Sequence, residues 1–445
     1  MSMLCMLLKN TENNMNKKII NPEDATNIVK NSIVKRRSKD SRLKLFGRVA
    51  IGLAVCFLLF LFYSIFTKGY PGFFQYYVTL DINFDRERID PKGDLSDNSL
   101  FDGDASTIVN ESLFSIIEPK GRKEKKLAKK IVSSGKDVRI AKMVKDDPGL
   151  FGTVTQVKFA LDDDIDSFLR GYIKRETPES ERRINDKVIG FIDKLNEEGR
   201  ISYEFSDYIL SGSASGNPEM AGIKGAFIGS LLTLSVCLLI AFPLGVATAV
   251  YLEEIAKKNR ITEIIEVNIN NLAAVPSVVF GIMGLAIFIS IFGMPRSIPL
   301  VGGMVLALMT LPTIIISSRA AIRAVPPSVR DAAYGIGASK LQVIFHHVIP
   351  LAMPGMLTGT IIGMAQALGE TAPLLMIGMV AFIVDIPNSV LDPGTVLPVQ
   401  IFMWADFAER MFIQKTSAAI IVLLGFLIAM NALAVYLRKK LERRW

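Results

Sequence analysis

The chain has few residues of the kinds that build redox, metal or disulfide sites. Among its 445 residues are 3 cysteines, 2 histidines and 2 tryptophans. Cys5, Cys56 and Cys237 cannot form a disulfide framework, and the last two lie inside apolar runs, where a free thiol acts as a small hydrophobic group. His346 and His347 are neighbours and therefore point in different directions on a helix. We expect no metal and no cofactor in this protein.

A phosphate-binding loop for ATP is also missing. The pattern Gly-x-x-x-x-Gly-Lys-Ser/Thr, whose backbone amides hold the phosphates of a nucleotide, occurs nowhere in the sequence. We therefore expect a protein that is not an enzyme, and any energy from ATP has to come from another subunit.

Apolar residues are abundant, and charge is unevenly placed. Half of the residues are hydrophobic and the mean hydropathy is +0.36, while 21% are charged. These values predict a membrane protein with a polar extramembrane part. The net charge of +8 does not indicate nucleic acid as a partner, because Lys and Arg gather in residues 1–48 and in the tail 438–445, beside apolar runs. Membrane topology explains this placement, since basic flanks stay in the cytoplasm.

Six apolar runs are long enough to cross a hydrocarbon core of roughly 30 Å. They cover residues 49–66, 222–251, 270–293, 299–318, 349–382 and 416–437. An even number of spans places both ends of the chain on one side, and the basic loops make that side the cytoplasm. We expect an all-α, multi-pass protein of the inner (cytoplasmic) membrane, in contact with lipid, with residues 1–48 as a disordered basic arm and residues 438–445 as a basic tail.

Residues 67–220 have the mixed composition of a folded soluble domain and, by alternation of sides, lie in the periplasm. Apolar periodicity predicts strands at 77–84, 153–161 and 200–210 and helices at 106–117, 123–132 and 177–199. This is a small α+β domain between the first two spans, without a catalytic pattern. The acidic run from Asp162 to Asp166 lacks the glycine and the distal glutamate of a calcium loop, so we expect a solvated helix N-terminus there.

The fifth span carries three glycines spaced four residues apart. Gly355, Gly359 and Gly363 give a smooth helix face for close packing of another helix. Gln366 and Glu370 continue that face, so we expect them to look toward protein and not toward lipid.

A break is expected in the same span. Pro373 leaves the carbonyl of Gly369 without its usual donor, so the helix should end between them. Glu370 is the only ionisable residue well inside the last five spans, where a lone carboxylate costs roughly 2.5 to 3.5 kcal/mol. Two roles fit: a group of the translocation pathway or gate, together with Gln366, Thr371 and Pro373, or a structural hydrogen bond between helices.

The stretch 331–350 lies between two apolar spans and is too polar to cross a bilayer. Asp331, Ala332, Ala333, Gly337 and Pro350 belong to a predicted short amphipathic helix with one bare face. Their spacing resembles the EAA loop of ATP-binding-cassette (ABC) importer permeases, which docks the permease onto its ATPase, with Asp in place of Glu. The resemblance implies that this stretch couples the chain to an ATPase; the alternative is an ordinary loop between helices.

Further segments resemble one branch of these permeases. Residues 271–281, 310–313, 323–333 and, above all, Ala-Leu-Gly-Glu-Thr-Ala-Pro-Leu-Leu at 367–375 are similar to phosphate ABC importer permeases of the PstA type. The resemblance implies a type-1 importer (MetI-like) core, with five spans in residues 221–437 following the first at 49–66. It also implies a heterodimer with a second phosphate permease subunit, two ATP-binding subunits and a periplasmic phosphate-binding protein.

The resemblance thus implies a permease subunit that forms half of the pathway of an ATP-driven, high-affinity importer of inorganic phosphate. Gln366 stands where many relatives carry Arg, so the cation that pairs with Glu370 is expected from the partner subunit. Two alternatives remain: a permease for another oxyanion, such as molybdate or sulfate, and a membrane-anchored sensor that uses the periplasmic domain.

Overall fold

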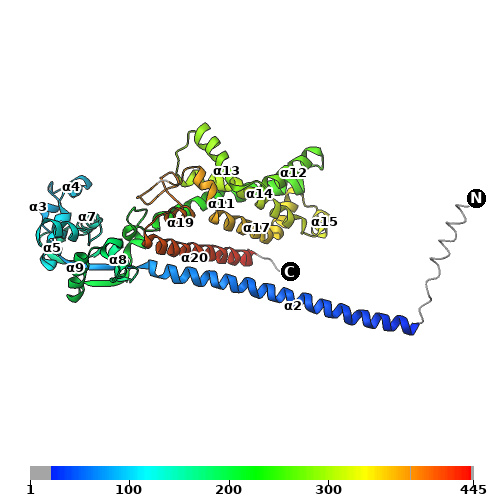
Figure 1. The fold of residues 1–445 in the computed structure, drawn as a ribbon. Helices are drawn as coiled ribbons and strands as arrows, with labels where there is room; N and C mark the ends of the chain where they lie inside the picture. Colours follow the sequence, from blue (N-terminus) through cyan, green and yellow to red (C-terminus); the bar gives the residue numbers. More distant parts are fainter. Residues whose placement is uncertain (1–21, 381, 442–445) are drawn as a thin grey trace, which may run out of the picture. The chain divides into compact units, whose positions relative to one another are not determined.

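The computed structural model describes residues 22–380 and 382–441. The chain forms two compact units, one up to Ser64 and one from Ile65 onward. Most of the first unit is helix α2 (Pro22–Gly69), which contains the predicted first span (Figure 1). None of the apolar stretch of this helix is buried within the described part of the chain.

The predicted disordered arm is wrong for residues 22–48, which are helical, while residues 1–21 lie outside the described residues. The sequence from 23 to 46 contains neither Pro nor Gly and is rich in Lys and Arg, which favour helix. Lys44 and Asp40, four residues apart, pair at 2.7 Å. The polar segment therefore continues the apolar helix without interruption.

A three-stranded antiparallel sheet forms the middle of the α+β domain. β1 (Phe74–Asn83) lies between β2 (Val154–Ala160) and β3 (Ile201–Phe205). In this register Val78 faces Phe159 on one side and Ile201 on the other. The three predicted strands exist, although the third ends five residues early, at Phe205.

Helices cover one face of this sheet. The α-helices are α3 (Arg86–Ile89), α4 (Asp97–Asp102), α5 (Ala105–Ile117), α6 (Gly121–Ala128), α7 (Lys136–Asp146), α8 (Asp163–Leu169), α9 (Asp186–Glu197) and α10 (Asp207–Ser211). Short 3-10 turns lie at Tyr70–Phe73, Pro148–Leu150, Glu179–Glu181 and Pro218–Met220. The helix predicted from residue 177 begins only at Asp186, because Asn185 is extended and the 3-10 turn precedes it.

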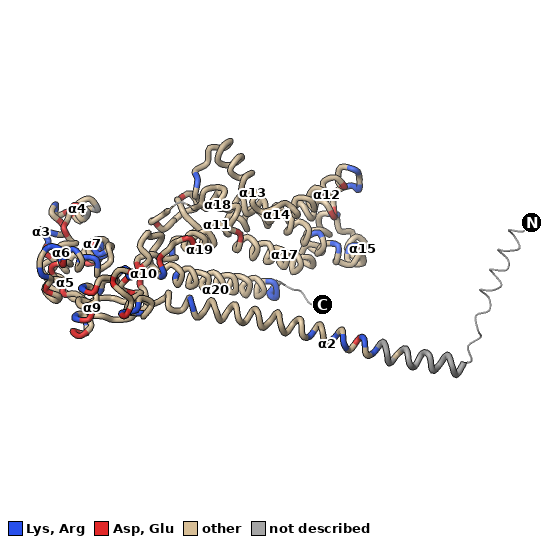
Figure 2. The backbone as a smooth tube through the Cα atoms, in the orientation of Figure 1, with Lys and Arg blue, Asp and Glu red and all other residues tan. Residues whose placement is uncertain are grey.

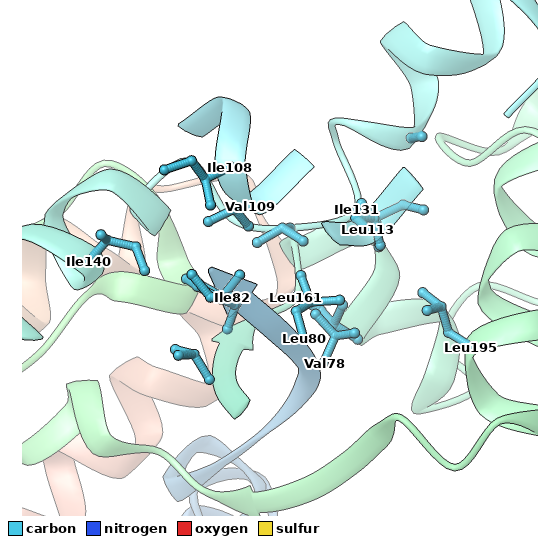
Figure 3. Packing of buried hydrophobic residues seen from close by; sticks show 14 of the residues in the cluster. Val78, Leu80, Ile82, Ile108, Val109, Leu113, Ile131, Ile140, Leu161 and Leu195 are labelled. Atoms are coloured by element: carbon cyan, nitrogen blue, oxygen red, sulfur yellow. The ribbon is translucent and has the colours of Figure 1, made fainter. Parts of the chain in front are cut away.

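The core of this domain gathers the alternate residues of β1. Val78, Leu80 and Ile82 are fully buried and point toward Val109 and Leu113 of α5 (Figure 3). Ile131, Ile140, Leu161 and Leu195 complete the same cluster. The period-2 pattern that predicted β1 thus produced a strand with one buried face.

The second half of the chain is helical. Its α-helices are α11 (Lys224–Val250), α12 (Arg260–Ala273), α13 (Ser277–Gly284), α14 (Pro299–Arg323), α15 (Pro327–Gly335), α16 (Lys340–Gln342), α17 (Ile349–Gly369), α18 (Ala372–Met376), α19 (Leu397–Ala405) and α20 (Arg410–Leu441). A π-helical turn at Tyr251–Ile255 continues α11, and a second one at Leu285–Ile291 continues α13. Another π-helical turn, at Val343–Val348, directly precedes α17. Lys and Arg gather at α12, at α15 and at the end of α20, while the lengths of α11, α14 and α17 carry almost no charge (Figure 2).

Within the described residues, five helices are long and apolar enough to cross a membrane, or six if one bent pair is a single span. The bent pair corrects the predicted straight span at 270–293: Arg260–Ala273 and Ser277–Ile291 meet at 102°. Pro276 lacks an amide hydrogen and disfavours the helical conformation of Val275, so the chain turns there. The predicted span 349–382 likewise ends at Gly369.

Helix α14 lies between α11 and α17 and packs closely against both. A Cβ on Gly303 of α14 would lie 2.5 Å from Cβ of Val236 on α11. A cluster of buried residues that includes Val301, Val305 and Leu306 fills the space around α14. Helices α11, α14 and α17 thus pack together and position the residues of the candidate site.

Candidate functional site

The stretch predicted to dock an ATPase begins with α15. Asp331 and Ala332 are exposed, whereas Ala333 is buried in a cluster with Val250, Ile322 and seven further buried residues. One side of α15 is therefore held by the ends of α11 and α14, and the other is free.

The single helix predicted for 331–350 is wrong, because the structure divides it. α15 ends at Gly335, and Gly337 has a φ of +87°, in the left-handed region that side chains with a Cβ rarely adopt. Ser339 then caps α16. Its hydroxyl accepts from the Gln342 amide, and the Ser339 amide donates to the Gln342 side chain. From there the backbone runs through a π-helical turn into α17, and Pro350, which has no amide hydrogen to donate, follows that turn directly.

Large apolar side chains around this turn have no cover within the described chain. The exposed fractions are 46% for Tyr334, 84% for Ile336, 60% for Leu341 and 59% for Phe345. Apolar groups exposed together in this way mark surfaces for protein partners. The free face thus consists of Asp331 and small residues of α15 beside an apolar turn.

An arginine directly before the motif ties α15 to the transmembrane helices. Arg330 donates to Glu254 Oε1 through Nη2 at 2.7 Å and through Nε at 3.2 Å. It also donates to the carbonyls of Ile322 and Val325 at 3.0 and 2.8 Å, near the end of α14. One side chain therefore joins the end of α11, the end of α14 and the start of the docking stretch.

A second ion-pair group lies beside it. Arg319, with 7% of its side chain exposed, donates to Glu253 at 2.6 Å and pairs with Glu266 of α12 at 2.7 Å. Arg323 pairs with the same Glu253 at 2.8 Å. The sequence analysis did not find these pairs, because the partners are 53 to 76 residues apart and no local pattern links them.

The glycines of α17 allow the close packing that their spacing predicted. A Cβ on Gly359 would overlap Ser317 Oγ of α14, and one on Gly355 would lie 2.6 Å from Cβ of Ala321. Gly363 is buried but has ordinary contacts, with Thr310 and Ile314 at 3.7 Å. Gly355 and Gly359 thus lie in close contact with α14, whereas Gly363 does not need the absence of a Cβ.

The predicted break in this span is confirmed. α17 ends at Gly369, Glu370 is extended with φ −79° and ψ 121°, and α18 begins at Ala372. Pro373 is buried, and Gly281 of α13 approaches it so closely that a Cβ would lie 2.6 Å from Pro373 Cα. The break is held in place by a neighbouring backbone.

The polar residues near the break are not covered by their own chain. Gln366 is exposed, and Glu370 and Thr371 are half-buried. No cation in the described part of the chain lies within 4 Å of the Glu370 carboxylate. Gln366 lies one helical turn after the exposed Ile362 on α17, whereas Glu370 and Thr371 lie in the break beyond the end of that helix.

The acidic run 162–166 departs from the solvated turn that we expected. Asp162 does cap α8, but Asp163 and Asp166 are buried. Burial raises the pKa of Asp162 to about 6 and that of Asp163 to about 7, with nearby carboxylates adding to the effect. Asp166 is compensated, since it pairs with Arg170 and accepts from the Tyr76 amide at 2.8 Å.

This acidic region meets the start of the last span. Lys415 of α20 is 1% exposed and donates to the Ala221 carbonyl at 2.7 Å, and Gln414 donates to the Tyr172 hydroxyl at 2.8 Å. No local pattern predicts the burial of Lys415, since only the fold brings residues 172, 221 and 415 together.

Two family models match the chain. Residues 241–444 match "Binding-protein-dependent transport system inner membrane component", and residues 30–179 match a domain family of unknown function. A chain of the MetNI methionine ABC transporter in its inward-facing conformation is 15% identical and covers 50% of this chain and 96% of its own, with a TM-score of 0.41.

Three relatives are similar in sequence. The probable ABC transporter permease protein YqgI of Bacillus subtilis is 32% identical over 41% of this chain and 60% of its own length. The phosphate transport system permease protein PstC of Haemophilus influenzae is 30% identical over 47% of this chain and 73% of its own. The phosphate transport system permease protein PstA 1 of Mycobacterium tuberculosis is 34% identical over 35% of this chain and 51% of its own length.

The chain thus spans between about half and three quarters of the length of these relatives. Its helical core, the bent and broken spans and the small sheet domain agree with the fold class expected from the sequence. The resemblance to permeases of the PstA type is confirmed, and the chain belongs to the family of binding-protein-dependent transport system inner membrane components.

Proposed function

We propose that this chain is a transmembrane permease subunit of an ATP-driven importer of inorganic phosphate and forms half of the translocation pathway. The observation that carries the proposal is the broken span. Gln366 near the end of α17 is exposed, and Glu370 and Thr371 in the backbone break that follows are only half-buried by their own chain. Irregular backbone at membrane depth is tolerated where it is buried in protein or lines a water-filled path. The names of the relatives, PstA and PstC, support phosphate as the solute.

The docking stretch is the proposed site of coupling. Asp331 and Ala332 on α15 and the turn at Gly337 present a free surface with exposed apolar side chains, while buried Ala333 anchors α15 and Pro350 follows within the helix that leads to Gly369. The end of α14 and Arg330 join that surface to the transmembrane helices. A movement of an ATPase bound there would therefore reach α11, α14 and α17 directly.

The proposed assembly is the one that the resemblance to phosphate permeases implies. It contains a second permease subunit, which would lie beside Glu370, two ATP-binding subunits, one of which would bind the docking stretch, and a periplasmic phosphate-binding protein. The chain itself lacks the phosphate loop of an ATPase, so ATP hydrolysis is assigned to a partner. Both ends of the chain are placed in the cytoplasm by the positive-inside rule.

Uptake of radiolabelled phosphate tests the function. Cells whose only phosphate importer contains this chain should lose ATP-dependent uptake when the gene is deleted and regain it when the full chain is restored. Excess sulfate or molybdate should not compete. Competition by either anion, with weak inhibition by unlabelled phosphate, would assign the chain to another oxyanion, and intact uptake in the deletion strain would reject transport altogether.

A further inference from the structure

An apolar groove opens between α17 and α20, with one side chain of α11 at its edge. Its volume is 200 Å³. The lining residues are Leu238, Leu357, Thr360, Ile361, Met364, Met430, Asn431, Leu433, Ala434 and Leu437. Thr360 donates its hydroxyl to the carbonyl of Met356 at 2.9 Å, so it needs no partner from the groove. The groove therefore suits an apolar occupant.

Cations stand at one end of this groove. The lining residues of α20 extend from Met430 to Leu437, and Arg438 follows Ala434 by one helical turn on the same face. Arg438 Nη1 donates to Thr358 Oγ1 of α17 at 3.3 Å, which ties the guanidinium to α17 next to the groove-lining residues Leu357 and Leu437. Its remaining donors have no acceptor in the described part of the chain, and neither Lys439 nor Lys440 forms an ion pair there.

The groove also lies at a suitable depth. From Met430 to Arg438 a helix rises about 12 Å, close to half of a hydrocarbon core of roughly 30 Å. Exposed Tyr436 and the three basic residues after Leu437 are the kinds of side chain that lie at the headgroup level. One end of the groove is thus at the level of lipid phosphates and the other is within the acyl region.

We propose that this groove binds one anionic phospholipid, with an acyl chain between α17 and α20 and its headgroup phosphate on Arg438. The inference is independent of phosphate transport. Charge complementarity selects an anionic lipid over a neutral one, because each basic residue near an anionic headgroup adds about fivefold to the affinity. The apolar lining selects a lipid over a free anion, which has no groups to fill the groove.

The test is lipid binding to the complete chain, purified in detergent with the subunits that accompany it and then stripped of lipid. Phosphatidylglycerol and phosphatidylcholine with identical acyl chains are titrated in, and bound lipid is counted by native mass spectrometry. One phosphatidylglycerol should bind about tenfold more tightly than phosphatidylcholine.

Two pairs of variants separate headgroup from chain. Arg438→Gln should weaken phosphatidylglycerol binding about fivefold, whereas Lys439→Gln, the same charge loss at a neighbouring exposed residue, should change it less than about twofold. Ala434→Phe, which fills the groove, should weaken binding of both lipids, and Val435→Phe, outside the groove lining, should not.

Three results would overturn the proposal. Equal binding of the two lipids would remove the role of charge. Equal effects of Arg438→Gln and Lys439→Gln would mean general attraction to a basic tail. Unchanged binding in Ala434→Phe would mean that the groove holds no lipid chain, as when a helix of another subunit covers it.

Discussion

At the scale of single residues, Glu370 is placed where the helix has already opened. Its amide bonds weakly to the Ala367 carbonyl at 3.3 Å, and its backbone is extended. A carboxylate beside a break lies next to backbone groups that water or a partner can reach. The free-energy cost of placing its charge in the membrane is therefore lower than in the middle of an intact span. The half-buried side chain still lacks a cation from its own chain, which leaves the partner subunit as the source.

Replacing Glu370 by Gln keeps the shape and removes the charge. If a partner cation faces Glu370, that cation then stays buried and unpaired, at a cost of about 3 to 5 kcal/mol. Phosphate uptake in vesicles should fall by about tenfold or more, or become leaky and independent of ATP, while the amount of assembled complex stays within about twofold. Normal coupled uptake would leave Glu370 as a plain hydrogen-bonding group, and loss of the complex would make it structural.

Asp163 provides a residue-scale prediction outside the membrane. Its folded pKa of about 7 lies above the ordinary value of 3.8, so between these values the folded domain holds a proton that the unfolded chain releases. Stability therefore falls as the pH rises from about 4 to about 7. Half-buried Asp162 and buried Asp166 and Glu219 have pKa values that are also raised, chiefly by loss of hydration, and act in the same direction.

The variant Asp163→Asn has no proton to release at this position, so it should lose less folding stability as the pH rises. At pH 8 its α+β domain should be more stable than that of the wild type, by at most about 4 kcal/mol. Hydrogen exchange of the β1 amides in the full chain, at pH 5 and pH 8, measures the effect. The exposed Glu179→Gln serves as the control and should leave the exchange unchanged. Equal pH dependence in wild type and Asp163→Asn would contradict the assignment.

At the scale of elements, the docking stretch is a helix, a turn and a second helix start. The turn depends on the positive φ of Gly337. A Cβ at this position would have no other atom within 4 Å, so glycine is required by the backbone conformation and not by crowding. Asn tolerates a left-handed conformation, and β-branched residues do not.

Gly337→Val should therefore distort the surface offered to the ATPase, whereas Gly337→Asn should preserve it. The expected result is loss of phosphate-stimulated ATP hydrolysis in reconstituted vesicles for the Val variant, with normal membrane insertion for both. Unchanged stimulation in Gly337→Val would count against this turn as part of the docking surface.

The link between Glu254 and Arg330 makes a second element-scale prediction. Glu254→Gln removes the charge partner of Arg330 but leaves its bonds to Ile322 and Val325, with an expected loss of about 1.5 to 3 kcal/mol at this contact. Coupling of ATP hydrolysis to uptake should weaken although both partners still bind. Glu263→Gln, an exposed acid on α12, is the matched control; an equal effect of the two changes would reject the role of the ion pair.

At the scale of the whole molecule, the α+β domain is fastened to the permease helices. Buried Lys415 of α20 reaches the Ala221 carbonyl just before α11, and Gln414 reaches Tyr172 of the domain. Arg170, which pairs with buried Asp166, also donates to the Pro71 carbonyl at 2.9 Å. These bonds indicate that the domain acts as part of the permease body and not as a freely tethered module.

Cysteine labelling tests the proposed topology in a chain whose own cysteines are replaced. A reagent that cannot cross membranes should react in intact cells with Lys120→Cys and Leu391→Cys, both exposed residues, but not with Ile336→Cys, which is 84% exposed on the docking side. After permeabilisation all three should react. Labelling of position 336 but not of position 120 in intact cells would invert the arrangement.

Local chemistry was enough to predict where four of the six spans lie, most of the sheet and the break in the fifth span, but not the bend at Pro276. Apolar length predicts a span, alternation predicted β1, and Pro373 ends α17 whatever lies around it. The glycine spacing predicted close packing for the same reason, since a missing Cβ is a property of the residue.

The tertiary structure alone decided which charges are paired or buried. Whether Asp163 is solvated, whether Lys415 is exposed and which acid holds Arg330 depend on residues 50 or more positions away, and no local spacing encodes those distances. The bend at Pro276 and the turn at Gly337 belong partly to this class: their residues permit a change of direction, and packing of α13 against the break and of Ala333 among α11 and α14 fixes the direction taken.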